Sequence, residues 1–443
     1  MQTSTTCVEQ PPAGVAAASA SSKDASGSAH IYRHPFAIAL TLGLFGLALL
    51  LLGIKTPSVM FYDEGYWVPE AKVFVLGPNL GSQVQQEKPP LGKLLLSVGM
   101  RAAGDNALGW RVASALCGAL ALVAIFLWTY LLLQDTRLAF LATGLTIFNN
   151  FWFVMSRIGM MDAFLVVFLM WSLVAFTASV VGDVTLGLRR FLFCLSGVLV
   201  GLAGACKWNA IDTLLVYLVL SVALWWIAHH PTARAHPSLS TCAEKVRQIG
   251  APVLLLGVII APLAAYSLCY WPLCVTIHRP FSVAEFVAIH KSIWHFNSNT
   301  ISNRAITMPW YRWPFNLNPQ RGLSYLVGNP LVAWGGLAAM LVCLRRFFKA
   351  ASFQEGLVFL LFAANYLQWS VTPEKGIFYY YYYPAVMVLG VTIAIAMRSL
   401  PASVLGVRIS LVLLIAAGVY FLRCYPQMAH LQAPWDCAFG CWP

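Results

Sequence analysis

Charged residues are scarce in this chain of 443 residues. Asp, Glu, Lys and Arg together make up 10% of it, whereas soluble domains average about 25%, and hydrophobic residues account for 59%. So few charges cannot cover the surface of a protein of this size in water. The chain also lacks a polar stretch long enough to fold around a core of its own. The composition therefore excludes a protein whose whole surface is exposed to water.

Closely paired cysteines are absent as well. The eleven cysteines show no CxxC spacing, and most lie in apolar stretches, so we expect neither a metal site nor a redox motif. Cys424, Cys437 and Cys441 fall in the last twenty residues or so, beyond the apolar stretches. A disulfide among them and three reduced thiols are both compatible with the sequence.

Long apolar stretches, in contrast, recur from end to end at about the 20 residues that a helix needs to cross a bilayer. We predict an all-α polytopic membrane protein with about eleven transmembrane helices. The predicted spans lie near 36–54, 108–133, 138–155, 161–181, 191–206, 210–228, 251–275, 323–344, 354–372, 379–397 and 404–422.

Three regions follow from these spans. Residues 1–34 are rich in Ala, Ser and Thr and are predicted to be a disordered cytoplasmic tail, not a signal peptide, because the first apolar run begins too far from the N-terminus. Residues 35–422 form the predicted transmembrane domain. Residues 423–443 form the predicted exoplasmic tail.

The net charge of +12 orients the chain and does not indicate a nucleic-acid partner. With the N-terminus inside, most Lys and Arg of the short loops face the cytoplasm. The short outer loops and tail then hold only Arg157, Lys207, Lys375 and Arg423. We therefore predict a multi-pass protein of the inner or plasma membrane with a cytoplasmic N-terminus.

Two long outer segments, about 55–107 and 276–322, carry most of the mass outside the predicted spans. In the first, KPPLGKLLLSVGMRAAG reads as a short amphipathic helix that follows Pro-Pro and lies in the membrane interface. Together the two segments are expected to cover a cavity above the spans.

Unusual polar residues collect on this outer side. Besides Asp63 and Glu64 they are Glu87, Lys88, Arg157, Asp162, Lys207, Asp212, His290, Lys291, His295, Arg304, Arg312, Glu374 and Lys375. Both charge signs on one face are typical of a phosphate-handling site at that interface. A transporter would instead need ionisable residues near the middle of the spans, and the middles are almost purely hydrocarbon.

The adjacent carboxylates Asp63 and Glu64 stand between aromatic residues in FYDEGYW. Aromatic neighbours exclude water and raise the proton affinity of a carboxylate, so one of the two is a candidate general base. A solvated acidic turn with aromatic membrane anchors fits the same letters.

Pro89 and Pro90 fix the backbone after Glu87 and Lys88, which holds two charges at a defined place above the membrane. An ordinary helix N-terminus is the alternative. Arg157 and Lys207 each end a span, where a snorkelling cation is common, but as a pair they are candidates for holding a phosphate leaving group.

The second long segment contains FVAIHKSIWHFN and MPWYRWPFNLNP. His290 and His295 are five residues apart and do not share one helical face, which argues against a metal site. Trp294, Trp310 and Trp313 would suit stacking on a sugar, but an interfacial aromatic belt is the favoured explanation, as it is for the run from Tyr379 to Tyr383.

The motifs YDEGYW, KPPLGKLL, GWRVASALCG, SRIGMMD, GLAGACKWNA, PWYRWPFNLNP, GNPLVAW and NYLQWS, with the following YYYYYP, occur in this order. In these motifs and their spacing the chain resembles the protein O-mannosyltransferases, from the first predicted span to the tenth. The resemblance implies the C-type glycosyltransferase fold with eleven spans. It also implies an inverting transfer of mannose from a polyprenyl-phosphate-mannose donor, without metal or other cofactor, to Ser or Thr of exported proteins.

By this resemblance Asp63 would take the proton from the acceptor hydroxyl, and Glu64 would assist or orient it. Arg157 would lie near the lipid phosphate. The remaining residues expected to bind donor or substrate are Glu87, Lys88, Asp162, Lys207, His290, Lys291, Trp310 and Arg312.

Two departures from the family pattern are visible. Only about fifty residues join the seventh and eighth spans, too few for the β-trefoil insert of eukaryotic members, so the chain resembles the bacterial type. Lys88 replaces the usual His before Pro-Pro, and EKPPL is similar to transferases that modify lipid A or envelope glycans. An envelope lipid or glycan is therefore the alternative acceptor.

Overall fold

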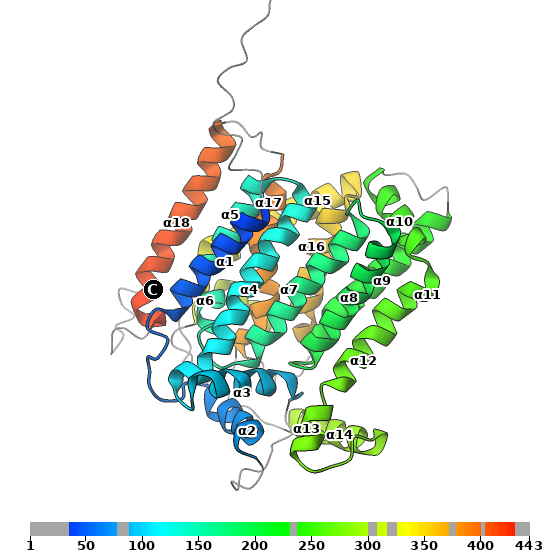
Figure 1. Ribbon diagram of the computed structural model, residues 1–443. Helices are drawn as coiled ribbons and strands as arrows, with labels where there is room; N and C mark the ends of the chain where they lie inside the picture. The colour runs from blue at the N-terminus through cyan, green and yellow to red at the C-terminus, as the bar shows by residue number, and fades with distance from the viewer. Residues whose placement is uncertain are drawn as a thin grey trace, which may run out of the picture.

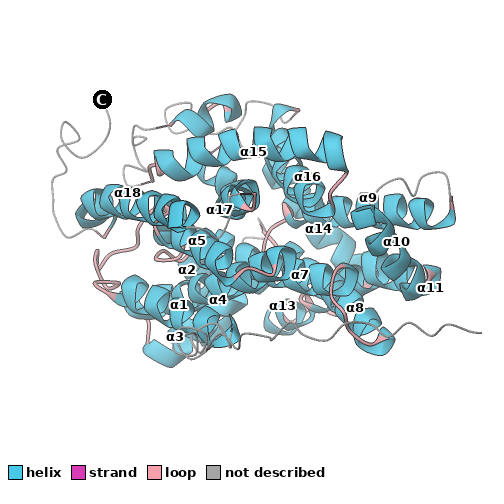
Figure 2. Ribbon diagram, turned by 90° about the horizontal axis from the view of Figure 1, so that it is seen from above, coloured by secondary structure: helices cyan, strands magenta, loops and turns pink. Residues whose placement is uncertain are grey.

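The computed structural model describes residues 35–77, 88–230, 237–299, 308–316, 326–371, 378–399 and 404–429. Within these ranges every regular element is a helix (Figure 2). The predicted disordered tail 1–34 lies outside the described residues, as do Glu87, Cys437 and Cys441.

Most helices run side by side in one bundle (Figure 1). The bundle contains α1 (Pro35–Leu51), α4 (Ala107–Leu133), α5 (Thr136–Ile147), α6 (Asn150–Met155), α7 (Met161–Val180), α8 (Leu186–Gly204), α9 (Ala210–His229), α11 (Ala251–Leu255), α12 (Ala261–Leu268), α15 (Pro330–Ala350), α16 (Phe353–Leu367), α17 (Tyr383–Met397) and α18 (Val404–Met428). A π-helical turn over Leu256–Ile260 makes α11 and α12 continuous. A 3-10 turn over Tyr379–Tyr382 leads into α17, and another over Gln368–Ser370 follows α16.

Each of the eleven predicted spans falls on helix. Eight helical stretches in the described ranges are long and apolar enough to cross a membrane by themselves. The other three, α1, α5 and α16, have 17, 12 and 15 residues. The polytopic helical fold is thus confirmed, and eleven crossings remain a prediction.

Two predicted spans have different bounds in the structure. The span 138–155 is interrupted at Phe148 and Asn149, because the side chain of Asn149 accepts a hydrogen bond from Phe151 N and starts α6. The span predicted at 323–344 begins at Pro330, where Asn329 is the N-cap and Pro330 the first helical residue.

Four helices lie across the lower end of the bundle in Figure 1. They are α2 (Glu64–Leu76), α3 (Leu91–Ala103), α13 (Trp271–Thr276) and α14 (Val283–Asn299). The amphipathic helix predicted after Pro-Pro is α3, while α14 was not predicted from the sequence. The two long connecting segments therefore meet at one end of the bundle, and α10 (Pro237–Ile249) lies at the other.

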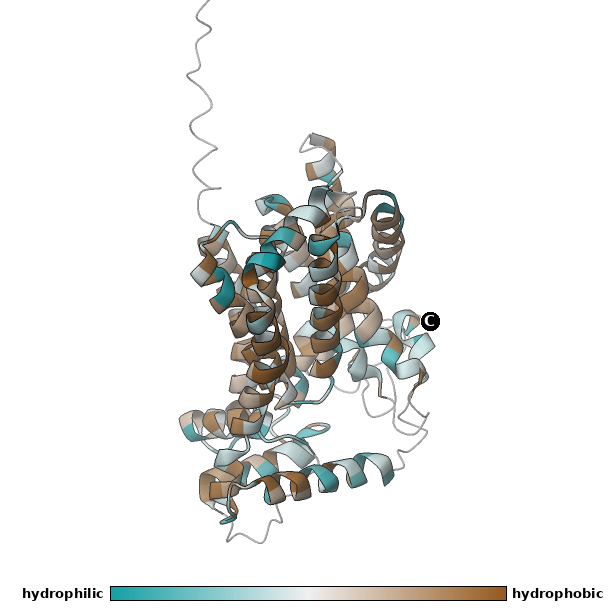
Figure 3. Ribbon diagram, turned by 90° about the vertical axis from the view of Figure 1, so that its right-hand side faces the viewer, coloured by the Kyte–Doolittle hydropathy of each residue, from teal (hydrophilic) through white to brown (hydrophobic). Residues whose placement is uncertain are grey.

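Close contact at a glycine places α3 against the start of α4. A Cβ at Gly99 would lie 2.6 Å from the carbonyl oxygen of Gly109, so a side chain there would push the helices apart. The middle of the bundle is dominated by hydrophobic residues and the ends are more hydrophilic (Figure 3). At the centre lie α7 and α17, which are buried on almost all sides.

The last helix extends to Met428, beyond the predicted end of the span at 422. Cys424 therefore lies inside α18 with a buried side chain and not in a tail.

Candidate active site

Asp63 is the residue just before α2, the N-cap position, but its carboxylate does not cap the helix. Instead its Oδ2 accepts a hydrogen bond of 3.2 Å from the hydroxyl of Tyr380. Burial raises the pKa of Asp63 from 3.8 to about 6; the nearby charge of Asp162 adds to this effect, while the Tyr380 bond and the cations of Lys207 and Lys88 oppose it. A carboxyl group with this pKa is mostly ionised at neutral pH and is suited to accept a proton.

Tyr62 fixes the direction in which Asp63 points. Its φ of 57° lies in the left-handed region, which costs a residue other than glycine roughly 1–2 kcal/mol. Its ring packs edge to face against Tyr380, with ring centroids 5.7 Å apart. The conformation is thus maintained by packing against the tyrosine that binds Asp63.

Glu64 is fully buried and all its bonds are made within the protein. The guanidinium of Arg111 donates to both carboxylate oxygens, at 2.7 and 2.8 Å. The backbone N–H groups of Phe61 and Gly159 donate at 2.7 and 2.9 Å. Four bonds satisfy this carboxylate, so it anchors the loop that carries Asp63 and is not available to accept a substrate proton.

Arg111 was missed as a site residue by the sequence analysis. Besides Glu64 it binds the carbonyl oxygens of Ile54, Pro57 and Val59 at 2.8 to 3.0 Å. It thereby fixes the segment between α1 and Asp63. The available signal was an arginine in the first turn and a half of a long apolar helix, where an unpaired charge would be costly.

Arg157 lies in the turn before α7 and is 5% exposed. Its Nη1 donates to the carbonyl oxygens of Leu50 and Leu52 at the end of α1, at 2.7 and 2.6 Å. Its Nη2 has no hydrogen-bond partner among the described residues. Burial lowers the pKa of Arg157 to about 10, so the side chain remains charged at neutral pH.

The Arg157 turn contacts the Asp63 turn through Gly159. The N–H of Gly159 binds Glu64, and a Cβ on this residue would lie 2.8 Å from the carbonyl oxygen of Trp110. Glycine therefore permits the close approach of two segments that were both predicted to lie on the outer side.

Lys207 and Asp162 form a buried ion pair of 2.7 Å. The ammonium group also lies over the rings of Tyr380 and Tyr381, 4.9 and 4.2 Å from their centroids. Because Tyr380 binds Asp63, the ion pair belongs to the same cluster as the candidate base. Among the described residues Lys207 pairs with Asp162 and makes no contact with Arg157, so the pairing of these two cations around one phosphate stays a prediction.

The tyrosine run was assigned to an interfacial belt as the simplest explanation. In the structure Tyr379, Tyr380, Tyr382 and Tyr383 are buried inside the protein. Tyr381 stacks on Trp369 with centroids 4.7 Å apart. The run therefore forms an inner wall of the site.

Lys88 links the first long segment to the second. Its ammonium group donates to the side chain of Asn297 on α14 at 2.7 Å. Its charge also acts on Asp63, which places Lys88 near the carboxylate. The neighbouring Glu87, also expected to bind substrate, is outside the described residues.

His290 holds α14 against the bundle. Its Nδ1 faces the carbonyl oxygen of Phe286 at 2.7 Å and must donate, so Nε2 accepts from the Tyr266 hydroxyl at 2.6 Å. The indole N–H of Trp208 donates to the same Tyr266 oxygen at 2.9 Å. Burial lowers the pKa of His290, which favours the neutral ring that this network requires.

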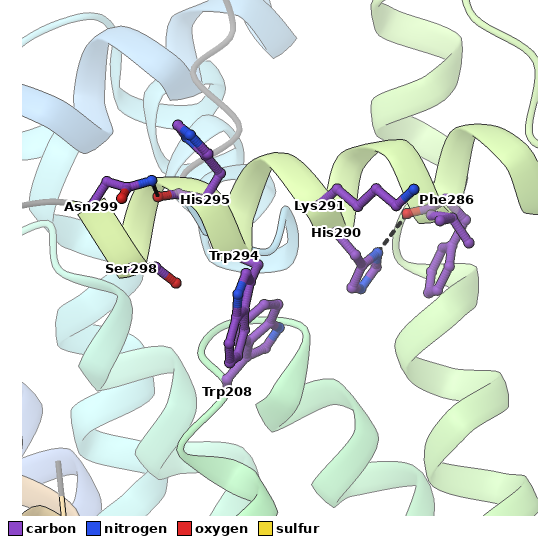
Figure 4. Close-up of a pocket in the computed structure, with 9 residues that line it drawn as sticks. Trp208, Phe286, His290, Lys291, Trp294, His295, Ser298 and Asn299 are labelled. Atoms are coloured by element: carbon purple, nitrogen blue, oxygen red, sulfur yellow. Dashed lines mark hydrogen bonds between the residues drawn. The ribbon is translucent and has the colours of Figure 1, made fainter.

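A pocket of about 630 Å³ opens beside this network (Figure 4). His290, Trp294 and Ser298 point from α14 toward the side that carries Trp208, as their spacing of four residues on a helix predicts. Lys291, His295 and Asn299 complete the polar lining, and His295 points away in this view. Since Trp208 follows Lys207 in the chain, the pocket adjoins the Asp63 cluster.

Trp310 and Arg312 lie on a short 3-10 turn, Trp310–Phe315. The Trp310 carbonyl accepts from the Tyr366 hydroxyl, and the two rings meet at 5.2 Å. Arg312 is exposed, and no hydrogen bond or ion pair in the described part of the chain joins it to Asp63. Trp313 is fully buried and packs on Trp369, so it is a core residue and not a sugar platform.

The cluster thus offers one base and several cations at one end of the bundle. Asp63 is the carboxylate free to accept a proton, and Lys88, Lys207 and the free Nη2 of Arg157 surround the region. This set can deprotonate a hydroxyl and hold a phosphate that leaves as the hydroxyl oxygen attacks.

Comparison with known proteins points to the same chemistry. The family profile of dolichyl-phosphate-mannose-protein mannosyltransferases matches residues 87–278. The chain is 25% identical over 406 residues to a polyprenol-phosphate-mannose–protein mannosyltransferase of Mycolicibacterium smegmatis, covering 76% of this chain and 75% of that protein. It is 24% identical over 413 residues to the protein of that name from Corynebacterium glutamicum, covering 77% and 78%.

Solved structures share the fold. The protein O-mannosyltransferase complex Pmt1-Pmt2 of S. cerevisiae, bound to the sugar donor, superposes with a TM-score of 0.73 at 13% identity over 91% of both chains. ArnT of Cupriavidus metallidurans, bound to undecaprenyl phosphate, gives 0.60 at 17% identity over 90% of this chain and 65% of that one. These likenesses confirm the predicted C-type glycosyltransferase fold.

Proposed function

We propose that the chain is a member of the dolichyl-phosphate-mannose-protein mannosyltransferase family and that it transfers mannose from a polyprenyl-phosphate-mannose donor to Ser or Thr hydroxyls of secreted or membrane proteins. The observation that carries the proposal within this chain is the position of the Asp63 carboxylate. The neighbouring Glu64 takes up the bonds of Arg111, whereas Asp63 accepts a hydrogen bond from Tyr380 and is influenced by the charges of Lys88 and Lys207.

In the proposed reaction Asp63 accepts the proton of the acceptor hydroxyl while its oxygen attacks the anomeric carbon of mannose. The bond from that carbon to the phosphate oxygen breaks, and the polyprenyl phosphate leaves with the electron pair. Attack from the face opposite the phosphate inverts the anomeric configuration. Asp63 ends the step protonated and returns its proton to solvent or to the released phosphate.

The phosphate needs cations when its charge develops. Lys88 is the best placed of the candidates, because it is not buried and its charge already acts on Asp63. Lys207 is neutralised in part by Asp162 and contributes a fixed positive charge behind the tyrosines. The free Nη2 of Arg157 is the third candidate donor.

The remaining candidates serve substrate binding in this proposal. His290 and Lys291 line the pocket on α14, and Trp310, on the same turn as Arg312, packs against Tyr366. Glu87 is assigned to the donor side with Lys88. Glu64 orients the Asp63 turn through Arg111.

We also propose that the Asp63 end of the bundle faces the exoplasm. The N-terminus of α1 and the C-terminus of α18 lie at opposite ends (Figure 1). The positive-inside rule assigns the end with Arg345, Arg346 and Lys349 to the cytoplasm. Residues 35–422 would then be the membrane domain of an inner or plasma membrane enzyme, with 1–34 cytoplasmic and with 423–443, which includes the last turns of α18, on the exoplasmic side.

An envelope lipid or glycan is the second candidate acceptor. Lys88-Pro89-Pro90 in place of His-Pro-Pro is the feature that favours it. The test must therefore separate protein products from lipid products.

The experiment uses the purified full chain in liposomes with radiolabelled polyprenyl-phosphate mannose and a Ser- and Thr-containing acceptor polypeptide. Label should appear in the polypeptide and resist lipid extraction. The Asp63→Asn variant should transfer no label to the polypeptide. Glu355→Gln, a buried carboxylate at the opposite end of the bundle, is the matched control. Label found only in lipid would assign the alternative acceptor, and full activity of Asp63→Asn would remove the proposed base.

A further inference from the structure

A second pocket, of about 480 Å³, lies at the end of the bundle opposite Asp63. It is lined by Leu132, Leu133, Arg346, Gln354, Arg398 and Ser399, where α4, α15 and α17 end and α16 begins. The 15 residues of α17 alone separate it from Tyr380 by roughly 22 Å. The pocket therefore has no part in the transfer site.

Arg346 is held in a fixed orientation in this pocket. Its Nη1 donates to the carbonyl oxygen of Ile395 at 3.1 Å, and its Nη2 donates to the hydroxyl of Ser399 at 2.7 Å. It forms no ion pair with a carboxylate of the described residues, so its positive charge is not neutralised. One bond to α17 and one to the turn that follows it pre-organise the guanidinium and lower the entropy cost of binding an anion.

Arg398 supplies the second guanidinium. One of its nitrogens pairs with Glu355 at 2.9 Å, and this carboxylate is fully buried and also bound by Ser352. The Arg398 side chain itself is 34% exposed, which leaves part of its donor edge open to the pocket. Two arginines against one carboxylate leave a surplus positive charge in the pocket.

Planar guanidinium groups match the oxygen geometry of phosphate. The cavity is much larger than a phosphate ion, and Leu132 and Leu133 give it an apolar wall beside the polar one. Basic pockets between the ends of membrane helices are typical sites for phospholipid headgroups. We propose that this pocket binds a phosphate group, as carried by an anionic phospholipid of the leaflet opposite the catalytic residues.

The test measures ligand binding to the purified full chain in neutral detergent. Thermal unfolding midpoints are recorded with phosphatidylglycerol, with phosphatidylcholine and with inorganic phosphate, and retained lipid is counted by native mass spectrometry. The variants are Arg346→Gln and the double variant Arg398→Gln with Glu355→Gln, which removes the ion pair as a unit. Arg345→Gln is the control, since it removes the same charge from the same helical turn outside the pocket.

Phosphatidylglycerol should raise the midpoint of the parent chain and of Arg345→Gln, and phosphatidylcholine should not. Its affinity should fall on the order of tenfold in each pocket variant, the loss expected for one charge-assisted hydrogen bond. Stabilisation by inorganic phosphate alone would assign the pocket to free phosphate, and stabilisation by phosphatidylglycerol alone to the lipid. Equal loss in Arg345→Gln, or no effect of either phosphate source, would overturn the proposal.

Discussion

The hydroxyl of Tyr380 donates to Oδ2 of Asp63 at 3.2 Å, across 317 residues of sequence. The bond stabilises the ionised carboxylate, while burial among aromatic rings stabilises the protonated form. Burial is the larger effect, so the pKa of Asp63 rises to about 6 and not further. The carboxyl group of Asp63 is therefore mostly ionised at neutral pH.

Activity should follow the ionisation of this carboxyl group. Because only the ionised form accepts a proton, kcat/KM should fall about tenfold per pH unit below pH 6 and level off above it. A pH profile of mannosyl transfer under limiting donor measures this. A flat profile from pH 5 to 8 would contradict the role of Asp63.

Tyr380→Phe should move that acid limb to higher pH. The variant loses the bond that favours ionised Asp63, so the pKa of Asp63 should rise by up to about one pH unit, the worth of a single hydrogen bond. Tyr382→Phe is the control, because its buried hydroxyl has no partner among the described residues. An unchanged limb in Tyr380→Phe would show that the bond does not tune the base.

Lys207 and Asp162 should shift the same limb in opposite directions. Lys207 lowers the pKa of Asp63 and Asp162 raises it. The limb should therefore move up in pH in Lys207→Gln and down in Asp162→Asn, and less far in the double variant. Shifts of the same sign in both single variants would mean that general damage to the site, and not charge, causes them.

Glu64→Gln should cost stability as well as activity. The variant removes one charge from a fully buried bidentate pair and leaves Arg111 uncompensated, a loss of about 3–5 kcal/mol. The free energy of unfolding and the transfer rate should both fall. The double variant Glu64→Gln with Arg111→Gln should lose less unfolding free energy than the sum of the losses in the two single variants. Lys72→Gln, which breaks the exposed pair with Asp105, should change stability little.

Much of the fold followed from the sequence, because apolar runs of spanning length leave few alternatives to a helical bundle. The side on which charges gather was predictable for the same reason. Helix breaks were less predictable. Asn149 starts α6 through a hydrogen bond of its side chain, and hydropathy averaged over a window of residues does not detect such a bond.

The site was predicted by residue type but not by role. Asp63 and Glu64 are neighbours in sequence, yet one faces Tyr380 and the other Arg111, and no local pattern separates these directions. The separation depends on the left-handed turn at Tyr62 and on contacts far apart in the chain. Arg111 and Tyr380 were overlooked because a span-end arginine and an aromatic run each have an ordinary membrane explanation.

Arg157 and Arg189 provide a matched pair for the last prediction. Both are buried arginines that bind backbone carbonyls at a helix end: Arg157 those of Leu50 and Leu52, and Arg189 that of Ser179 at 2.7 Å. Only Arg157 lies beside the Asp63 turn, and its Nη2 is unbonded among the described residues.

If that nitrogen binds the donor phosphate, Arg157→Ala should raise the KM for the polyprenyl-phosphate donor on the order of tenfold and leave the KM for the acceptor nearly unchanged. Arg157→Ala and Arg189→Ala should lower the thermal unfolding midpoint by similar amounts, since both lose the same kind of carbonyl contacts. Arg189→Ala should leave both KM values unchanged. Steady-state kinetics with each substrate varied in turn, alongside thermal unfolding, separate the two effects. A donor KM that changes equally in both variants, or in neither, would reduce Arg157 to an anchor of α1, because loss of carbonyl contacts alone would then account for the result.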